Sequence, residues 1–504
     1  MPSLPPVHLA IMQPAGYVHS LGFLDTARYL RWQLRRFGVE PTLAKNRLRE
    51  DALNIVFGAH LGFPPAWRER HACLFFNLEQ LGEGGAQVGD AYLDLLRSSA
   101  VADYDARNVP AYAADAADVP IVPFLHAPFL REAEPLPLEA RPIDLLFFGS
   151  INPRRRAFIE RVEACGLAVS VFDGPLYGPE RDGFIRQAKA VLNMPFYETS
   201  RFEQVRASLC LSLGTPVISE RIVGAEVPAA FEDKVDWIDG AGVESFFRER
   251  FATPAWFDSA RSRLDAWVNG PDPVNAYADL LAFGAGFFEG HRSRRPAQAA
   301  QPTCINLGSG KDYRPGWLNI DVLDRAEPDL VLDLGRAQTW PQTLATRFGG
   351  EVTLAPGTVE RIHANNVLEH VPDLPTLMGN ALALLAEGGR LEIEVPYEKA
   401  LTAWQDPTHL RAMNENSWLY YTDWFWYLGW FEHRFDIVEA AWLDAAVKPC
   451  EKAQAAFMRV TLRKRATTPR ERTVARAMRA DFGGLDDDRG SVADAASERA
   501  PALA

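Results

Sequence analysis

The segment 304–322 reads CINLGSGKDYRPGWLNIDV and carries the pattern that decides the fold of the C-terminal part of the chain. One apolar run ends at a turn that contains Gly308 and Gly310, and a second apolar run ends at Asp321. Glycine lets a backbone turn tightly and approach a ligand closely. The segment therefore predicts two strands joined by a binding turn, with a carboxylate at the end of the second strand.

The turn departs from the pattern of a dinucleotide-binding loop. Such a loop has a third glycine and an acidic residue about 20 residues further on. Here Lys311 and Tyr313 occupy the place of the third glycine, and Asp321 follows Gly308 by only 13 residues. A dinucleotide is therefore disfavoured, and a tight turn that binds nothing is the alternative for this segment taken alone.

The following 75 residues add two more strand ends with polar residues and then a fifth strand. VLDLG (331–335) contains Asp333, and RIHANNVLEHVPD (361–373) contains Asn365 and Asn366. A helix, a double glycine and a fifth strand follow in PTLMGNALALLAEGGRLEIEVPY (375–397). This order resembles the class I S-adenosylmethionine (SAM) methyltransferases, in particular their small-molecule branch, over roughly residues 304–462.

The resemblance implies a SAM site in which two glycines lie behind the methionine part and a carboxylate accepts hydrogen bonds from the ribose hydroxyls. It also implies two residues at the adenine and two near the sulfonium. Asn306 departs from the family pattern, which has an acid there, so we expect its amide to orient the SAM amino group. The short connection before the second strand predicts a rudimentary first helix. The seven implied SAM-binding residues are Gly308, Gly310, Asp321, Asp333, Leu334, Asn365 and Asn366.

The segment DPTHLRAMNENSW (406–418) offers a general base for an oxygen acceptor. A histidine near its ordinary pKa suits this work, and a carboxylate can fix its tautomer. We therefore predict His409 as the base, with Asp406 as its partner; the alternative is a helix-capping aspartate and a structural histidine. The tryptophan-rich stretch 418–433 is interpreted as a hydrophobic lid or core, with an acceptor wall or a membrane-surface contact as alternatives.

The first 290 residues repeat a strand–loop–helix pattern twice. VHLAIMQP (7–14) predicts a buried strand, and apolar residues then recur at helical spacing up to Phe37. The pattern restarts at IDLLFFGS (143–150) after a proline-rich connector. We predict an α/β protein with five parts: domains 1–135 and 136–290, a linker 291–303, a third domain 304–464 and a disordered tail 465–504. The acidic run 486–488 in that tail is interpreted as solvated.

Two segments of the second domain point to an anionic ligand. In SRFEQVRASLCLSLGTPVISE (200–220), Glu203 and Arg206 share one helix face, where they can hold a ribose and a diphosphate. Gly149 forms a turn before Arg154, which stands at a helix start that favours anions. Ordinary surface charges are the alternative for each segment alone.

Together these features resemble the nucleotide-sugar half of GT-B glycosyltransferases, with a match over about 7–290. The resemblance implies that Glu203 binds the ribose and that Arg206 or Arg154 binds the diphosphate. For the acceptor base, the candidates are His19, Glu79 and Asp105, each with a structural role as the alternative. A second glutamate typical of many retaining members is absent, so the stereochemistry stays open. We predict no metal site, since no Asp-x-Asp motif ends a strand here.

Composition limits the partners and the location. The net charge of −13 argues against nucleic acid, because phosphate binding needs a basic field. The five cysteines are scattered and include no Cys-x-x-Cys pair, which indicates reduced thiols. No signal peptide and no membrane-spanning run are recognised. We predict a cytoplasmic protein, with contact at the inner face of the membrane left open.

The predicted function is that of a fused glycosyltransferase and SAM-dependent O-methyltransferase in bacterial O-antigen or capsule synthesis. Its co-substrate is a nucleotide sugar, and its acceptor is a glycan or a lipid-linked sugar. Three alternatives remain: a natural-product tailoring enzyme, a methyltransferase with a non-catalytic glycan-binding module, and a pseudoenzyme with two dead sites.

Overall fold

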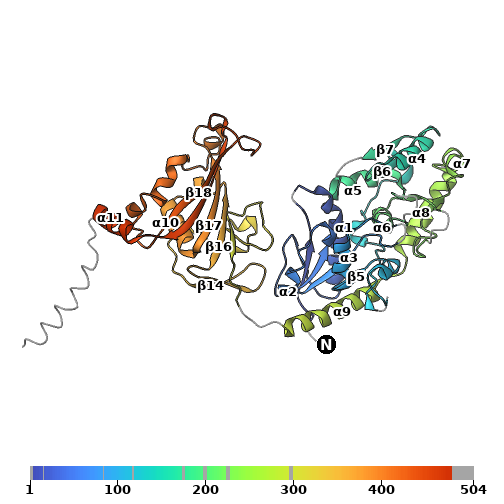
Figure 1. Cartoon of the computed structure of the whole chain (residues 1–504). Helices are drawn as coiled ribbons and strands as arrows, with labels where there is room; N and C mark the ends of the chain where they lie inside the picture. Colours follow the sequence, from blue (N-terminus) through green and yellow to red (C-terminus); the bar gives the residue numbers. More distant parts are fainter. Residues whose placement is uncertain are drawn as a thin grey trace, which may run out of the picture. The chain divides into compact units, whose positions relative to one another are not determined.

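The computed structural model describes residues 4–14, 16–82, 85–115, 118–172, 176–196, 201–222, 227–294 and 299–479 (Figure 1). The chain divides into two compact units, Met1–Pro296 and Ala297–Ala504. The acidic run 486–488 lies outside the described residues. Within the described part, no helix is long and apolar enough to cross a membrane.

The first unit begins with a five-stranded parallel sheet in the order β2-β1-β3-β4-β5. β1, β3 and β4 are buried along their whole length, which explains why they appear in the sequence as unbroken apolar runs. The strands and helices are β1 (Val7–Ile11), α1 (Phe23–Arg35), β2 (Thr42–Lys45), β3 (Leu53–Phe57), α2 (Trp67–Arg70), β4 (Cys73–Asn77), α3 (Asp90–Arg97) and β5 (Ala100–Asp103).

A second parallel sheet in the same unit has the order β10-β9-β8-β6-β7, which repeats the winding of the first sheet. Pro153 begins α4, and Asn152 caps that helix by accepting a hydrogen bond from the Arg155 N–H. Its elements are β6 (Ile143–Phe148), α4 (Pro153–Glu163), β7 (Val169–Phe172), α5 (Gly178–Gln187), β8 (Ala188–Asn193), α6 (Gln204–Ser212), β9 (Val217–Glu220), β10 (Asp236–Ile238), α7 (Val243–Ser245) and α8 (Pro254–Val268).

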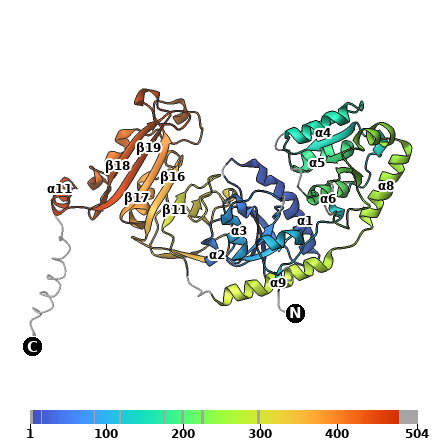
Figure 2. The same cartoon turned by 45° about the vertical axis from the view of Figure 1, so that its right-hand side comes forward.

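The long helix α9 (Val274–Ser293) crosses back to the first sheet, as Figures 1 and 2 both show. Tyr277 and Leu281 join the hydrophobic core of that sheet. The helix also packs so closely that a Cβ at Gly284 would lie 2.5 Å from Leu53. The sequence analysis assigned residues 274–290 to the second domain, and this assignment is wrong because their packing partner is the first sheet.

The second unit contains a seven-stranded sheet in the order β13-β12-β11-β16-β17-β19-β18. Its first five positions are parallel and follow the doubly wound order 3-2-1-4-5, and two antiparallel strands complete one edge. The elements are β11 (Cys304–Leu307), β12 (Leu318–Asp321), β13 (Leu330–Val331), the hairpin β14 (Gln342–Ala345) and β15 (Glu351–Leu354), β16 (Val359–Asn365), α10 (Leu374–Leu384), β17 (Leu385–Pro396), β18 (His433–Leu443), β19 (Phe457–Ala466) and α11 (Pro469–Arg479).

The expected start of the disordered tail at residue 465 is wrong. β19 continues to Ala466, and α11 follows. Glu471 on α11 forms ion pairs with Arg465 and Arg434, and these hold the pKa of Glu471 well below its usual range. The polar composition of the segment gave no sign of this helix, because ion pairs such as those of Glu471 connect it to the sheet.

The predicted fold class is confirmed. Two Rossmann-like parallel sheets form the first unit, as expected for a GT-B arrangement, and a third Rossmann-like sheet forms the second unit. The predicted rudimentary first helix is absent altogether, since the described residues between β11 and β12 contain no helix.

Within unit 1, a buried ion cluster joins α5 to α1. The Arg181 guanidinium donates to both Asp25 oxygens at 2.7 and 3.0 Å and to Asp182 at 2.7 Å, and Arg181 is only 4% exposed. Removing one partner of a buried ion pair leaves an uncompensated charge.

We predict that Arg181→Ala lowers the free energy of unfolding of unit 1 by about 3–5 kcal/mol. The control is Arg261→Ala, because Arg261 forms ion pairs with Glu139 and Asp258 that are half-exposed. Such surface pairs contribute about 0–1 kcal/mol. Calorimetry of the two variants tests the difference, and equal losses would contradict the buried role of Arg181.

Candidate functional sites

The glycine turn after β11 lies directly against the loop after β16. Gly308 has a φ of +62°, and a Cβ there would lie 2.4 Å from the Val367 Cγ2 atom. Gly310 has a φ of +44°, and a Cβ there would make only an ordinary contact, 3.8 Å from the Gly308 carbonyl oxygen. Glycine is thus needed at position 308 for two reasons: the backbone is left-handed, and the Val367 side chain leaves no room for a Cβ. Gly310 is required by its backbone alone.

Asn319 organises the loop that replaces the first helix. It is fully buried, its side-chain N–H groups donate to the backbone carbonyls of Arg314 and Trp317, and the Asp329 carboxylate accepts from both its side chain and its backbone N–H. Its carbonyl oxygen accepts from Asn306 Nδ2 at 3.0 Å. Asn306 is itself buried, and its amide nitrogen also donates to the Asp312 carbonyl, so this nitrogen holds the loop. The prediction for the SAM amino group concerns its amide oxygen and stays a prediction.

The carboxylate of Asp321 faces the glycine turn. One oxygen accepts from the Gly310 N–H and the other from the Leu323 N–H, each at 2.8 Å. Asp333 binds the Gly335 N–H in the same manner and remains half-exposed. Leu334 is buried in the hydrophobic core, so its side chain does not face a site at this edge.

The two asparagines after β16 are exposed at the carboxyl edge of the sheet. Asn366 has a φ of +50°, and its side-chain Nδ2 donates to the side-chain oxygen Oδ1 of Asn365 at 2.9 Å. The Asn366 backbone N–H donates to the Glu394 carbonyl at the end of β17. Val367, which packs against Gly308, follows them directly in the chain.

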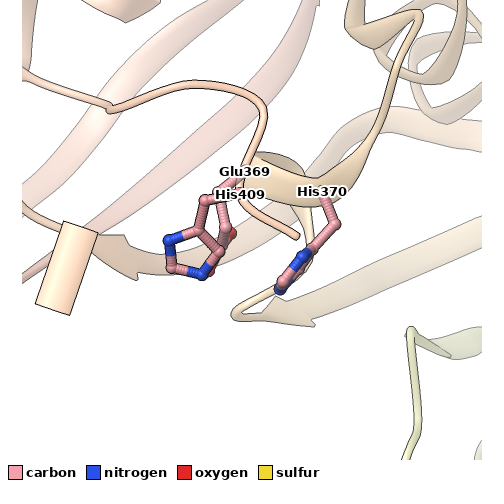
Figure 3. Close-up of side chains that lie close together, drawn as sticks. All are labelled: Glu369, His370 and His409. Carbon is pink, nitrogen blue, oxygen red and sulfur yellow. The ribbon is translucent and has the colours of Figure 1, made fainter. Parts of the chain in front are cut away.

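A cluster of one carboxylate and two imidazoles lies just beyond these residues. Glu369, His370 and His409 each bring one ligand-type atom within 4.8 Å of the others (Figure 3). Glu369 is 1% exposed, its Oε1 lies 4.0 Å from His409 Nε2, and burial raises its pKa. The segment that contains His409 is held there by the Leu410 N–H, which donates to the Glu369 carbonyl.

The predicted pairing of Asp406 with His409 is not the one that the structure shows. Asp406 accepts from the backbone N–H and the hydroxyl of Thr408, which lower its pKa. The Thr408 hydroxyl in turn lies 3.0 Å from His370 Nδ1, while His409 Nδ1 faces the Ala403 carbonyl at 2.9 Å. Asp406 therefore orients His370, and Glu369 is the carboxylate beside His409.

In the second sheet of unit 1, a group of charged residues surrounds the turn after β6. Gly149 has a φ of +124°, and a Cβ there would lie 3.2 Å from Arg206 Nη2. Glu203 lies 3.5 Å from Arg206 and 3.3 Å from Arg155. Glu203 and Arg206 are expected on one helix face, but Glu203 precedes α6 as its N-cap residue, and its carboxylate meets Arg206 beside the turn at Gly149.

The three consecutive arginines 154–156 each have different surroundings. Arg154 binds Glu220 at 2.5 Å and the Pro195 carbonyl. Arg155 is 2% exposed and donates to the carbonyls of Met194 and Ser150, and burial lowers its pKa to about 10. Arg156 is exposed. Sequence reasoning missed Arg155, because three adjacent arginines give no signal of which one turns inward.

The three candidate bases of the first sheet lie on different loops. His19 meets the Tyr177 hydroxyl at 2.9 Å, and Glu79 lies 3.5 Å from His60 Nε2. Burial works to raise the pKa of Asp105, but hydrogen bonds from Arg107 outweigh it, so this pKa lies below its usual range.

Asp105 also lies 3.5 Å from Arg201, which the sequence analysis did not single out. Its two arginine neighbours make Asp105 an anchor rather than a base. Arg201 and Gln80 exchange hydrogen bonds, so loops of both sheets of unit 1 meet at this point.

Two surface hollows lie away from these groups. One of about 990 Å³ is lined by residues at the start of β4 and β5, and one of about 480 Å³ by residues at the start of β16 and in β17. Both are at amino edges, whereas ligands of doubly wound sheets bind at carboxyl edges. The residues predicted from sequence lie at the carboxyl edges.

A family model described as a methyltransferase domain matches residues 240–432. This match covers less than half of the chain. It begins in unit 1, includes the glycine turn and the Glu369 cluster, and ends before β18. Over this range the chain is therefore similar to methyltransferase domains. No curated protein matches the chain.

Solved structures of two kinds resemble parts of the chain. A SAM-dependent methyltransferase from Mesorhizobium loti is 13% identical, covers 36% of this chain and 98% of its own, and has a TM-score of 0.22. AviGT4, a glycosyltransferase involved in avilamycin A biosynthesis, is 16% identical, covers 57% and 98%, and has a TM-score of 0.37. TarM is 10% identical, covers 51% and 57%, and has a TM-score of 0.34. Since each TM-score is below 0.5, no function is inferred from these likenesses.

We predict that the contact between Gly308 and Val367 appears as an energetic coupling. Gly308→Ala costs about 1–2 kcal/mol for the left-handed backbone and about 1–3 kcal/mol for overpacking. Only the overpacking is relieved when Val367→Ala is added. A double-mutant cycle on the unfolding of unit 2, measured by calorimetry, should therefore give a coupling of about 1–3 kcal/mol.

Gly357→Ala is the control for backbone strain, since Gly357 has a φ of +73° and nothing within 4 Å of its missing Cβ. Its effect should add to that of Val367→Ala within about 0.5 kcal/mol. Additivity of Gly308→Ala with Val367→Ala would contradict the close contact.

Proposed function

We propose that the protein is a SAM-dependent O-methyltransferase fused to a glycosyltransferase, acting on a bacterial surface glycan such as O-antigen or capsule. One observation carries the proposal: a glycine turn, an acidic strand end and a cluster of groups suited to proton transfer share one sheet edge in the methyltransferase domain. The turn and Asp321 suit SAM, and the Glu369 cluster suits the activation of a hydroxyl.

The methyl transfer needs little covalent help from the protein. Its main work is alignment of the sulfonium with the acceptor oxygen, an effect worth up to about 7–11 kcal/mol. Asp333, Asn365 and Asn366 extend the SAM site along the carboxyl edge from Asp321. In the proposal, the acceptor hydroxyl loses its proton at the group formed by His409 and Glu369, and then attacks the methyl carbon.

The glycosyl transfer is proposed at the arginine group of the second sheet. Arg155 and Arg206 bring two guanidinium groups to one glycine turn, beside the carboxylate of Glu203. Arg206 can stabilise a departing diphosphate, and Glu203 can accept hydrogen bonds from a ribose. Arg155 is 2% exposed and supports the turn and Glu203 from behind. Arg154, which is paired with Glu220, is the other candidate for the diphosphate.

For the glycosyl transfer, we propose that the base that activates the acceptor is His19 or Glu79. His19 meets the hydroxyl of Tyr177, and Glu79 has His60 as its neighbour. Asp105 is tied to two arginines, and this observation favours one rival function: a glycan-binding module that recruits substrate to the methyltransferase without turning over a nucleotide sugar.

The fusion itself raises the local concentration of one product for the next step. The acceptor is proposed to be a glycan or lipid-linked sugar at the cytoplasmic face of the membrane.

We expect the purified protein to release nucleotide from one sugar donor in the presence of cell-envelope glycan, and Glu203→Ala to lose this release. The control is Glu244→Ala, because Glu244 forms an exposed pair with Arg161 in the same domain. Loss in both variants would argue against a specific role for Glu203. SAM binding, measured in parallel by calorimetry, should be equal in all three proteins. No release with any donor, with SAM still bound, would support the glycan-binding rival.

A further inference from the structure

The side chain of Glu369 is in an unusual position for a carboxylate. It is 1% exposed, and within the described part of the chain neither of its oxygens has a hydrogen-bond partner. Burying a carboxylate without partners is costly, so such a group neutralises itself or meets a cation. The groups in front of it are the imidazoles of His409 and His370 (Figure 3).

The hydrogen bonds around the two imidazoles determine where their protons are. The Ala403 carbonyl can only accept, so His409 carries a proton on Nδ1. The Thr408 hydroxyl donates to Asp406 at 2.6 Å, so it accepts from His370, which also carries its proton on Nδ1. In the neutral form of both rings, the free lone pair is therefore on Nε2.

With both rings neutral, this arrangement lacks a positive charge. The Nε2 lone pair of His409 lies 4.0 Å from a carboxylate oxygen of Glu369. Two electron-rich atoms therefore face each other in a buried place. The His409 ring is oriented by the Ala403 carbonyl, and the His370 ring is oriented by the Thr408 hydroxyl, which Asp406 holds. Histidines that ligate metals are oriented in this way, by donating the other ring N–H to an oxygen acceptor.

We propose that Glu369, His370 and His409 bind a divalent transition-metal ion such as Zn²⁺. Two imidazole nitrogens and one carboxylate oxygen match the ligands of catalytic zinc sites, which keep a further position open. Mg²⁺ and Ca²⁺ prefer sets of oxygen ligands and fit this cluster poorly. A tetrahedral zinc ion separates its ligands by roughly 3.3 Å, so the cluster contracts by about 1 Å when it binds the ion.

The role of the ion rests on the proposed methyltransferase function. The open position can take the acceptor hydroxyl, and a bound divalent ion makes an oxygen-bound proton much more acidic. That proton leaves to water. The oxygen then forms a bond to the methyl carbon while the bond from this carbon to the sulfonium sulfur breaks, which yields the methyl ether and S-adenosylhomocysteine. His409 then holds the ion instead of accepting the proton.

The test is Zn²⁺ binding to the full-length protein after treatment with a chelator, measured by titration calorimetry, with Co²⁺ absorption as a second readout. We expect one ion per chain and at least 100-fold weaker binding in His409→Ala, His370→Ala and Glu369→Gln. Thr408→Val, which removes only the positioning of His370, should weaken binding about 10–100-fold. The control is His433→Ala, since His433 faces Glu387 in an exposed pair elsewhere in this domain and should leave binding unchanged.

Glu369→Gln keeps the result interpretable if a histidine variant fails to fold. It removes a buried charge that has no partner, so the metal-free variant should melt at the same temperature as the wild-type protein or higher. It should also lose the rise in melting temperature that Zn²⁺ causes. No Zn²⁺ binding by the wild-type protein, or equal binding by Glu369→Gln, would overturn the metal site.

The two proposals fail in different ways. Zn²⁺ binding that depends on the three residues, in a protein that methylates no acceptor, would leave the metal site standing and refute the proposed function. Methylation that is insensitive to chelation but lost in His409→Ala would refute the metal site and return His409 to the role of a base.

Discussion

The carboxyl edge of the sheet in unit 2 depends on one contact, the packing of Val367 against Gly308, which has no room for a side chain. It fixes the distance between the loops that follow β11 and β16, which are neighbouring parallel strands. The chain after Val367 leads within two residues to Glu369. The same contact therefore sets how near the acidic and imidazole groups lie to the turn. A ligand held by one loop is within reach of the other.

The absence of a helix after β11 changes how this turn can bind a ligand. In most doubly wound sheets the first turn opens a helix, whose N-terminus attracts anions. Here a network around Asn319 replaces that helix, and the carboxylate of Asp321 occupies the N–H group of Gly310. The edge is thus rich in acceptors and poor in donors. It suits hydroxyl groups and a cationic sulfonium better than phosphates, whereas the arginine group of the second sheet has the opposite character.

The two sheets of the first unit are similar in winding but differ in what they present. The second has guanidinium groups around Gly149, two of them stacked on aromatic rings. The first has scattered polar residues, of which Asp105 is neutralised by arginines. α9 belongs to the core of the first sheet although it follows the second along the chain, so the chain passes twice between them. This double crossing and the ion cluster around Arg181 both connect the two sheets, which together form one compact unit.

The sequence by itself determined the strands, the glycine turns and the order of the three sheets, because these follow from local apolar runs and from backbone freedom at residues such as Gly308. It also brought Glu203 and Arg206 to the same end of α6, since they are only three residues apart in the chain. Only the tertiary structure decided which partner each polar side chain takes. Asp406 binds Thr408 rather than His409, Arg155 rather than Arg154 turns inward, and Glu369 meets two imidazoles. Such choices depend on segments tens of residues apart that approach only when the chain is packed, and no local pattern in the sequence records them.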